Sequence, residues 1–160
     1  MENHVFIRTA VTDDVVGIRE LLVQTWHDTY DDLYGVEKVT ALTDTWHASR
    51  ALAAQIARND ASFLVALLNG GIIGHAFALE RDNVALLHRL YVLPPFQRQG
   101  IGEMLLTKVV KRFPSATRMR LTVEGRNVKG VSFYKRHGFV VRDETTDDGN
   151  LLMEKDLSAL

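Results

Sequence analysis

A glycine-containing turn directly ahead of an amphipathic segment is the most chemically suggestive stretch of this chain. Residues 97–102 read Gln-Arg-Gln-Gly-Ile-Gly and follow the apolar run LYVLPPF. The first amides of a helix have no intrahelical partner and point outward together at the positive end of the helix dipole. Gly100 and Gly102 keep side-chain carbon away from these amides, and Arg98 adds a cationic donor. The turn therefore predicts a site for phosphate or pyrophosphate.

Three phosphate-binding schemes place glycines in such turns, and the spacing separates them. A P-loop requires Lys and a hydroxyl residue directly after its second glycine, where this chain has Glu103 and Met104. A dinucleotide fingerprint requires a third glycine, where this chain has Leu105, and a strand–helix–strand unit, whereas hairpins join the strands expected before the turn. The pattern Gln/Arg-x-x-Gly-x-Gly/Ala remains. A glycine-rich turn that binds no ligand is the alternative interpretation.

A second motif, LTVEGRNVKGVSFYKRHGFV, begins at Leu121. Asn127 is a favourable N-cap for a short helix expected within residues 128–138, and Gly138 is favourable past its end. Val131 and Tyr134 are three residues apart and therefore share a face of this helix. We expect the Tyr134 phenol to point in the same direction as the glycine turn.

The two motifs, in this order, resemble the signatures of the GNAT superfamily of acetyl-CoA-dependent N-acetyltransferases, and the resemblance extends from about Val5 to Leu157. It implies that the amides of residues 98–103 bind the coenzyme pyrophosphate and that the preceding strand pairs with the pantetheine arm. It also implies that Asn127 contacts the pantetheine and that Gly130 allows close approach of the coenzyme. Glu103 departs from the family pattern, which often has a cation there. The coenzyme-binding residues implied are Leu90, Tyr91, Val92, Gln97, Arg98, Gln99, Gly100, Ile101, Gly102, Glu103, Asn127, Gly130 and Tyr134.

The resemblance implies direct transfer of acetyl from the thioester to an amine, which needs no cysteine nucleophile. An amine with a pKa of about 10.4 is uncharged in only about one molecule in a thousand at pH 7, so a base must remove its proton. The backbone N–H near Val92 is the implied donor to the oxyanion. Tyr134 stands where the family commonly has the acid that protonates the leaving thiolate, and the alternative is an aromatic packing residue.

The general base is less clearly marked. Related sequences often carry a glutamate six residues before the Val92 position, but this chain has Leu86 there. Strand alternation would place His88 on the face of Leu86 and Leu90, where an imidazole could relay the proton or simply pack. Glu124 and Glu80 lie at expected strand ends and could act through water, although such carboxylates are usually just solvated.

The segment TWHDTYDDLYG, residues 25–35, bears on the acceptor amine. Trp26, Thr29 and Tyr30 share a helical face and resemble the Trp-x-x-Thr-Tyr segment of a bacterial branch that includes polyamine acetyltransferases. Trp26 and Tyr30 would then form an acceptor wall, or alternatively anchor the helix in the core. The nearby carboxylates, Asp28, Asp31 and Asp32, could attract a small basic amine. Protein N-termini, lysine side chains and aminoglycosides remain open as acceptors. A catalytically silent regulator that binds acyl-CoA remains open as an alternative function.

Elements able to position these residues follow from hydrophobic periodicity and turn signals. Strands are expected at 5–8, 62–68, 71–80, 84–93, 118–124, 139–144 and 150–157, and helices at 12–26, at 36–59 as one or two, at 103–113 and within 128–138. The resulting α+β fold has a mixed, mostly antiparallel seven-stranded sheet flanked by helices, in a sandwich-like GNAT arrangement.

Composition narrows the class of protein. The 160 residues are the usual length of one domain, and the net charge of −1 without a cationic block argues against nucleic acid or membrane as partner. The absence of cysteine and the scatter of six histidines argue against a metal site. With no apolar run long enough to cross a bilayer and no signal-like start, we expect a cytoplasmic enzyme. A homodimer formed through the terminal strands is also compatible with the sequence.

Overall fold

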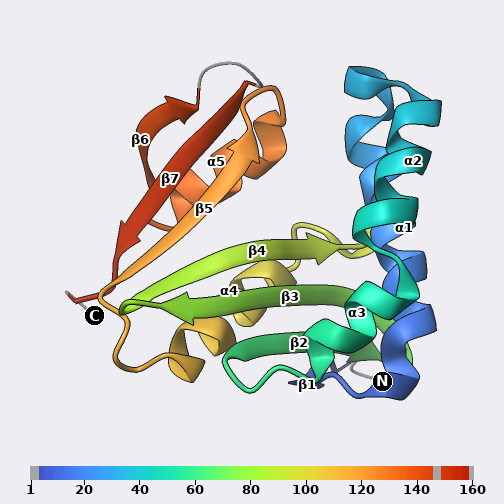
Figure 1. Ribbon diagram of the computed structural model, residues 1–160, viewed down its shortest axis with the longest axis horizontal. Coiled ribbons are helices and arrows are strands. Elements are labelled where there is room, and N and C mark those ends of the chain that lie inside the picture. Colours follow the sequence, from blue (N-terminus) through green and yellow to red (C-terminus); the bar gives the residue numbers. More distant parts are fainter. Residues whose placement is uncertain (1–3, 146–148, 159–160) are drawn as a thin grey trace.

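The computed structural model describes residues 4–145 and 149–158, and seven strands in this part form one sheet (Figure 1). Their spatial order is β1-β2-β3-β4-β5-β7-β6. The strands are β1 (Phe6–Thr9), β2 (Ala61–Leu68), β3 (Gly71–Arg81), β4 (Val84–Val92), β5 (Arg118–Glu124), β6 (Val140–Thr145) and β7 (Asn150–Asp156). The helices are α1 (Val15–Tyr34), α2 (Val36–Trp46), α3 (Ser49–Ile56), α4 (Ile101–Arg112) and α5 (Val128–Arg136). The expected mixed sheet is confirmed, and the segment 36–59 forms two helices.

Helix α1 is longer than the sequence predicted and begins differently. Thr12 is not its N-cap; it opens a 3₁₀ turn, Thr12–Asp14, ahead of the helix. The Asp14 carboxylate accepts a hydrogen bond from Val11 N–H (2.8 Å) and pairs with Arg8 (2.7 Å). The helix runs past Trp26 because the chain has no Gly or Pro until Gly35, which ends it at a φ of 89°.

The two apolar faces of the sheet are covered by different helices. One core combines α1 and α3 with β2 and β3, through residues such as Ile18, Leu52 and Phe77. The other packs α4 onto the opposite face, through residues such as Leu105 and Met119. Strands β2 and β3 are buried over most of their length, as expected for strands covered on both faces.

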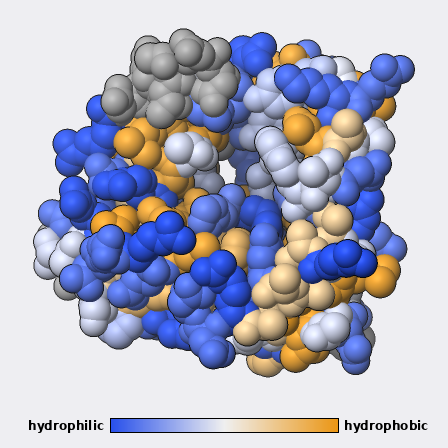
Figure 2. All heavy atoms as spheres, viewed as in Figure 1, coloured by the Kyte–Doolittle hydropathy of each residue, from blue (hydrophilic) through white to orange (hydrophobic). Residues whose placement is uncertain are grey.

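The centre of the sheet splits. Strands β4 and β5 run parallel but pair only from Val84 to Leu86, opposite residues 118–120. Beyond this point β4 stays with β3 and β5 stays with β7, so the two halves of the sheet diverge (Figure 1). The space-filling view is hollowed between the C-terminal strands and the α1–α2 pair (Figure 2).

A β-bulge lies in β4 just past the split. Ala78 is opposite Leu87 and Phe77 is opposite Arg89, so His88 is the extra residue. His88 contacts Phe77 in the α1–α3 core, whereas Leu87 and Leu90 both pack with the α4 core. The expectation that His88 shares a face with Leu90 is therefore wrong, because the bulge interrupts the two-residue alternation.

The exposed sheet edges are β1 and β6, because β7 lies between β5 and β6. The expected dimer through the terminal strands would therefore have to use β1 or β6 rather than the last strand. Of the predicted turn at residues 147–149, Asp147 and Asp148 lie outside the described residues, and Gly149 has a φ of 78°.

Candidate active site

A cavity of about 1860 Å³ occupies the split between β4 and β5. Its walls come from α1, α2, the divergent ends of β4 and β5, the turn before α4, and α5. Typical pockets for one small ligand measure about 300–1,000 Å³, so this cavity has room for a coenzyme and a second substrate. All predicted coenzyme- and substrate-binding residues line it except Gln99, whose side chain donates to Pro95 O (3.3 Å).

The glycine turn presents backbone amides to this cavity. Gly100 is the N-cap of α4 and has a φ of 81°, a left-handed conformation that glycine adopts without strain. The first intrahelical bond runs from Met104 N–H to Gly100 O (3.0 Å), so the three preceding amides of the helix have no partner in it. Gly102 has a second role, because a Cβ there would lie 3.1 Å from the ring of Phe133 on α5. Arg98 also has a positive φ, 63°, a backbone conformation found in turns whose successive amides converge on an anion.

The edge of β4 that faces the cavity is open for hydrogen bonding. Leu93 N–H donates to the backbone of β3 (2.9 Å). Because N–H groups alternate between the two edges of a strand, Tyr91 also faces β3, while Leu90 and Val92 face the edge that β5 has left. The Gln97 side chain donates to Val92 O on this edge (2.8 Å). The backbone pairing expected of Leu90 and Val92 is thus available, and Tyr91 contributes its side chain instead.

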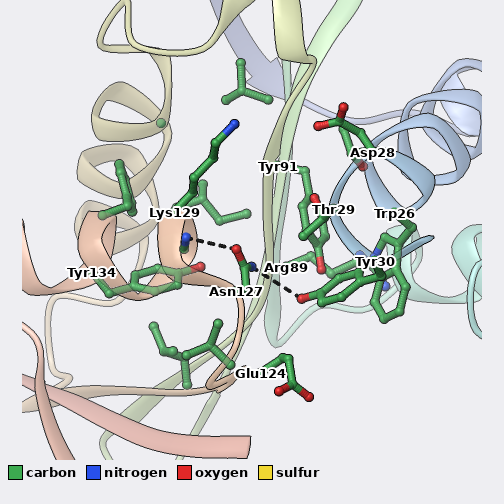
Figure 3. Close-up of a pocket in the computed structure, with 18 of the residues that line it drawn as sticks. Trp26, Asp28, Thr29, Tyr30, Arg89, Tyr91, Glu124, Asn127, Lys129 and Tyr134 are labelled. Atoms are coloured by element: carbon green, nitrogen blue, oxygen red, sulfur yellow. Dashed lines mark hydrogen bonds between the residues drawn. The ribbon is translucent and has the colours of Figure 1, made fainter. Parts of the chain in front are cut away.

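The opposite wall is formed by α5 and its N-cap (Figure 3). Asn127 Oδ1 accepts from Gly130 N–H (3.1 Å), as the sequence predicted, and Asn127 Nδ2 donates to Tyr30 OH (3.5 Å). A Cβ at Gly130 would lie 2.7 Å from Asn127 Nδ2. The cap itself therefore accounts for glycine at this position, and since Gly130 also lines the cavity, close approach of the coenzyme stays a prediction.

The Tyr134 hydroxyl points toward Asn127 and the cavity (Figure 3). The ring packs edge-on against Phe139, at 5.4 Å between centroids. Burial raises the pKa of the Tyr134 phenol well above its usual value. The group therefore holds its proton at neutral pH, which is the state an acid requires.

Glu124 is a buried carboxylate, only 4% exposed, so the alternative interpretation as a solvated strand-end residue is wrong. It accepts hydrogen bonds from Tyr34 OH (2.5 Å), Arg126 Nε (3.0 Å) and Arg126 N–H (3.1 Å). The hydrogen bond from Arg126 lowers the pKa of Glu124, and burial together with Glu124 raises the pKa of Tyr34 to about 12. The Tyr34–Glu124 bond joins α1 to β5 across the cavity.

The other two candidate bases lie differently. His88 lines the cavity, and burial, followed by the nearby Arg89 charge, lowers its pKa, so its imidazole is neutral at pH 7. Glu80 is not brought to the site, because it lies opposite Ala85 at the paired end of β4 and lines a separate small cavity with Asp60. The sequence could not separate Glu80 from Glu124, since both end a strand.

Aromatic side chains of α1 form the wall expected for the acceptor. Trp26 and Tyr30 lie 4.6 Å apart between ring centroids, and Tyr34 stacks on Tyr30 at 5.4 Å. Helix α2 adds Trp46, 5.7 Å from Trp26 and half-exposed. The sequence missed Tyr34 because α1 was expected to end before it.

The carboxylates of α1 divide into two groups. Asp31 is paired with His27 (2.6 Å), whereas Asp28 and Asp32 line the cavity.

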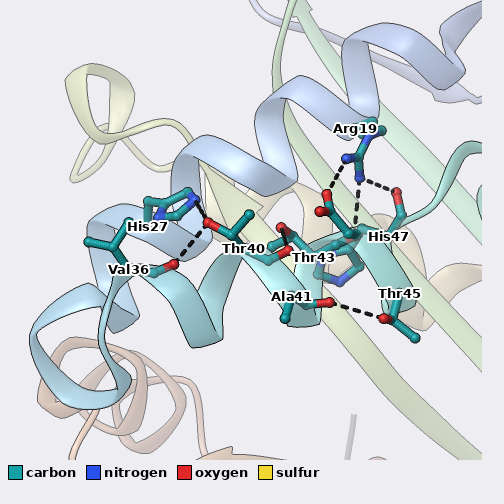
Figure 4. Close-up of polar contacts among 9 residues, drawn as sticks. Arg19, His27, Val36, Thr40, Ala41, Thr43, Thr45 and His47 are labelled. Carbon is teal, nitrogen blue, oxygen red and sulfur yellow. Dashed lines mark hydrogen bonds and ion pairs between the residues drawn. The ribbon is translucent and has the colours of Figure 1, made fainter.

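Contacts between α1 and α2 hold this wall in place. Arg19 donates to the backbone carbonyls of Thr43 and His47 (both 3.1 Å) (Figure 4).

Residues 4–145 and 149–158 lack two kinds of feature. No helix there is long and apolar enough to span a bilayer. No group of three or more His, Asp or Glu side chains there is arranged to hold a metal ion.

Comparison with known proteins agrees with this geometry. Residues 30–155 match the family model described as an acetyltransferase (GNAT) domain. The chain is 31% identical over 156 residues to spermidine N(1)-acetyltransferase of Thermoplasma acidophilum, covering 93% of this chain and 95% of that protein. The crystal structure of PaiA N-acetyltransferase from T. acidophilum in complex with coenzyme A superposes with a TM-score of 0.91 at 30% identity, covering 96% of this chain and 99% of that one. A Staphylococcus aureus GNAT acetyltransferase shares the fold, with a TM-score of 0.79 at 15% identity over 97% of this chain and 100% of that one. The chain belongs to the GNAT family of acetyl-CoA-dependent N-acetyltransferases.

Proposed function

We propose that the 160 residues act as one catalytic domain that transfers acetyl from acetyl-CoA directly to the primary amine of a small basic molecule. The observation that carries this proposal is the split between β4 and β5, which brings the phosphate-binding turn, an open strand edge and the Tyr134 hydroxyl to one cavity.

The coenzyme would lie along the split. Its pyrophosphate would accept hydrogen bonds from the free amides at the start of α4, with Arg98 as a charged donor. Its pantetheine amides would pair with the open edge at Leu90 and Val92. The exposed Glu103 lies at the same helix start and weakens the positive field there, but it leaves the backbone donors in place.

Val92 and Tyr134 would act on the reacting thioester. Val92 N–H would donate to the oxygen that becomes negative when the amine attacks the carbonyl carbon. The Tyr134 O–H would then give its proton to the departing thiolate sulfur, and its raised pKa ensures that the proton is present.

Glu124 would receive the amine proton through water. It faces the cavity from β5 and remains ionised because Tyr34 and Arg126 hydrogen-bond to it. The lowered pKa that results makes it a weak base, so relay through water fits it better than full proton capture. His88, neutral and on the opposite strand, is the second candidate.

A small amine is supported by the cavity wall and by the relatives. Trp26 and Tyr30 offer aromatic faces to an alkyl ammonium group, and Asp28 and Asp32 offer negative charge. The T. acidophilum relative is named for acetylation of spermidine.

The decisive experiment measures thiol release from acetyl-CoA with a panel of small amines, an N-terminal peptide and a lysine peptide. Turnover confined to small amines supports the proposal. Turnover of peptides alone would favour a protein acetyltransferase, and CoA binding by calorimetry without any turnover would favour a regulator. In the positive case, His88→Ala and Glu124→Gln identify the base, since the true base shows the larger loss of kcat and a shifted acid limb of the pH profile.

A further inference from the structure

A buried arginine lines the acceptor side of the cavity without a carboxylate partner. Arg89, on β4, is 8% exposed, and its guanidinium lies over the contacting rings of Phe63 and Phe77, 5.5 and 4.7 Å from their centroids. It projects from the same face as Tyr91, two residues on, behind Tyr30 (Figure 3).

The hydrogen-bond partners of Arg89 in the described residues are neutral. Its Nε donates to His75 Nε2 (3.0 Å), and one terminal nitrogen donates to Gln55 Oε1 (2.6 Å). Because His75 Nδ1 faces Leu64 O (2.8 Å), the proton of the buried imidazole sits on Nδ1, and Nε2 is free to accept. Burial, followed by the Arg89 charge, holds the pKa of His75 well below its usual value, so this ring stays neutral beside the guanidinium.

None of the ion pairs within residues 4–145 and 149–158 includes Arg89. Arg19, the nearest comparable case on the same side, is paired with Asp44 (2.8 Å). A buried charge without a counter-charge is costly, and burial accordingly lowers the pKa of Arg89 to about 10. A guanidinium has five donors, and the two bonds above leave the remainder for a ligand.

Two further nitrogens of this wall are buried without a well-formed hydrogen bond in the described residues, and the polar neighbour of the Trp26 indole is the Tyr91 hydroxyl. The two nitrogens are Trp26 Nε1 and His47 Nδ1, and their rings lie 5.3 Å apart. Both residues line the cavity, and His47 is 3% exposed. Burial, with the charges of Arg89 and Arg19, lowers the pKa of His47 to about 4. The wall therefore combines an unpaired cation with the indole N–H of Trp26, and the neutral His47 imidazole can add a donor in the tautomer that protonates Nδ1, so the set suits an anion.

We propose that Arg89, with Trp26 and His47, forms a subsite for a carboxylate of the acceptor, so that the substrate class is a small amine that also bears a carboxylate. This inference rests on the proposed N-acetyltransferase function and names its acceptor more closely. A carboxylate matches the planar fork of a guanidinium, and the amine end would lie toward Val92 and the acidic residues of the cavity.

Spacing along β4 sets the length of such an acceptor. Arg89 and Val92 are three residues apart in regular pairing with β3, which corresponds to about 10 Å of strand. The amine and the carboxylate must therefore be separated by several bonds, as in a diamino acid acetylated on its side-chain amine.

The test compares amines that differ only by the carboxylate: L-lysine with cadaverine, and L-ornithine with putrescine, with spermidine as a further amine. We expect wild-type kcat/KM to favour the carboxylate-bearing member of at least one pair by about tenfold or more. Arg89→Gln should abolish this preference, and Arg89→Lys, which keeps the charge but not the fork, should retain part of it. Trp26→Phe, which keeps an aromatic ring and removes the N–H, should reduce the preference several-fold.

The matched control is Arg58→Gln, an exposed arginine paired with Asp60 outside the cavity, which should leave the preference unchanged. Calorimetry with CoA shows that each variant is folded. Should Arg89→Gln not fold, the Arg89→Lys and Trp26→Phe ratios decide. Faster turnover of cadaverine, putrescine or spermidine, with ratios unaffected by these substitutions, overturns the subsite but leaves the proposed function standing. Absence of thiol release with every amine overturns the proposed function itself.

Discussion

At the scale of single residues, environment rather than residue type assigns the chemistry. Tyr134 and Tyr34 both have raised pKa values, but the first is raised by burial and then by the neighbouring Tyr30, whereas Tyr34 also donates to Glu124. Glu80 is the next-to-last residue of β3 and Glu124 the last residue of β5, and only Glu124 reaches the large cavity. The sequence identified Tyr134 and Asn127 because a motif surrounds them, and it missed Arg89 and Tyr34 because no motif does.

Replacement of Tyr134 by Phe tests the proposed acid. The ring and its packing against Phe139 remain, and the hydroxyl is lost. We expect kcat to fall by about 10²-fold or more, with the Kd for CoA nearly unchanged. Steady-state assays and calorimetry measure the two quantities, and wild-type turnover by the variant would remove Tyr134 from this role.

Glu124→Gln tests the electrostatics of the buried carboxylate through stability. Its pKa is lower in the folded protein than in the unfolded chain, so its ionised form stabilises the fold above the usual carboxyl range, and this contribution is lost as pH falls through the folded pKa. We expect the variant to be less stable than wild type by about 1–2 kcal/mol at pH 7. The difference should shrink below about pH 4. Urea unfolding at several pH values measures it, and a difference independent of pH would contradict this assignment.

At the scale of elements, local signals located most helices and strands, and non-local effects explain the differences. Asn127 and Gly138 bound α5 as predicted because capping depends on neighbouring residues. The bulge at His88 was not foreseen, because it exists only in the pairing of β4 with β3.

The cap of α5 offers a double-mutant test at this scale. Alanine normally favours a helix interior over glycine by about 1 kcal/mol. At Gly130, however, the added Cβ would lie 2.7 Å from Asn127 Nδ2. We expect Gly130→Ala to destabilise the wild type and to stabilise the Asn127→Ala background. Thermal unfolding of the four proteins gives the coupling energy, and additive effects would show that the cap does not explain the glycine.

At the scale of the whole molecule, the proposed function depends on the divergence of β4 from β5, which opens the cavity. The sequence predicted both strands that diverge, but not the point of divergence, because β4 and β5 pair over only three residues and neither strand carries a local mark of that limit. The cavity consequently could not be located from the sequence, whereas the glycine turn could be located from its spacing.

Coenzyme binding across the split is expected to stabilise the whole fold. CoA at a free concentration of 100 times its Kd should raise the free energy of unfolding by about 2.7 kcal/mol, because only the folded protein presents both halves of the site. Chemical denaturation with and without CoA measures this gain. NAD and ATP at the same concentration serve as controls, and an equal gain with either would indicate a general nucleotide site.

The bulge in β4 also allows a side chain of the cavity to change without a change in the glycine turn. Leu87 belongs to the α4 core and Arg89 lies opposite Phe77 of the other core, so the extra residue between them leaves both side chains on the faces that regular alternation would give. Deletion of His88 would therefore remove the bulge and its imidazole from the cavity while Leu87 and Arg89 keep their faces, and the glycine turn downstream would keep its own backbone geometry. Acceptor choice and coenzyme use can in this way diverge independently within one lineage.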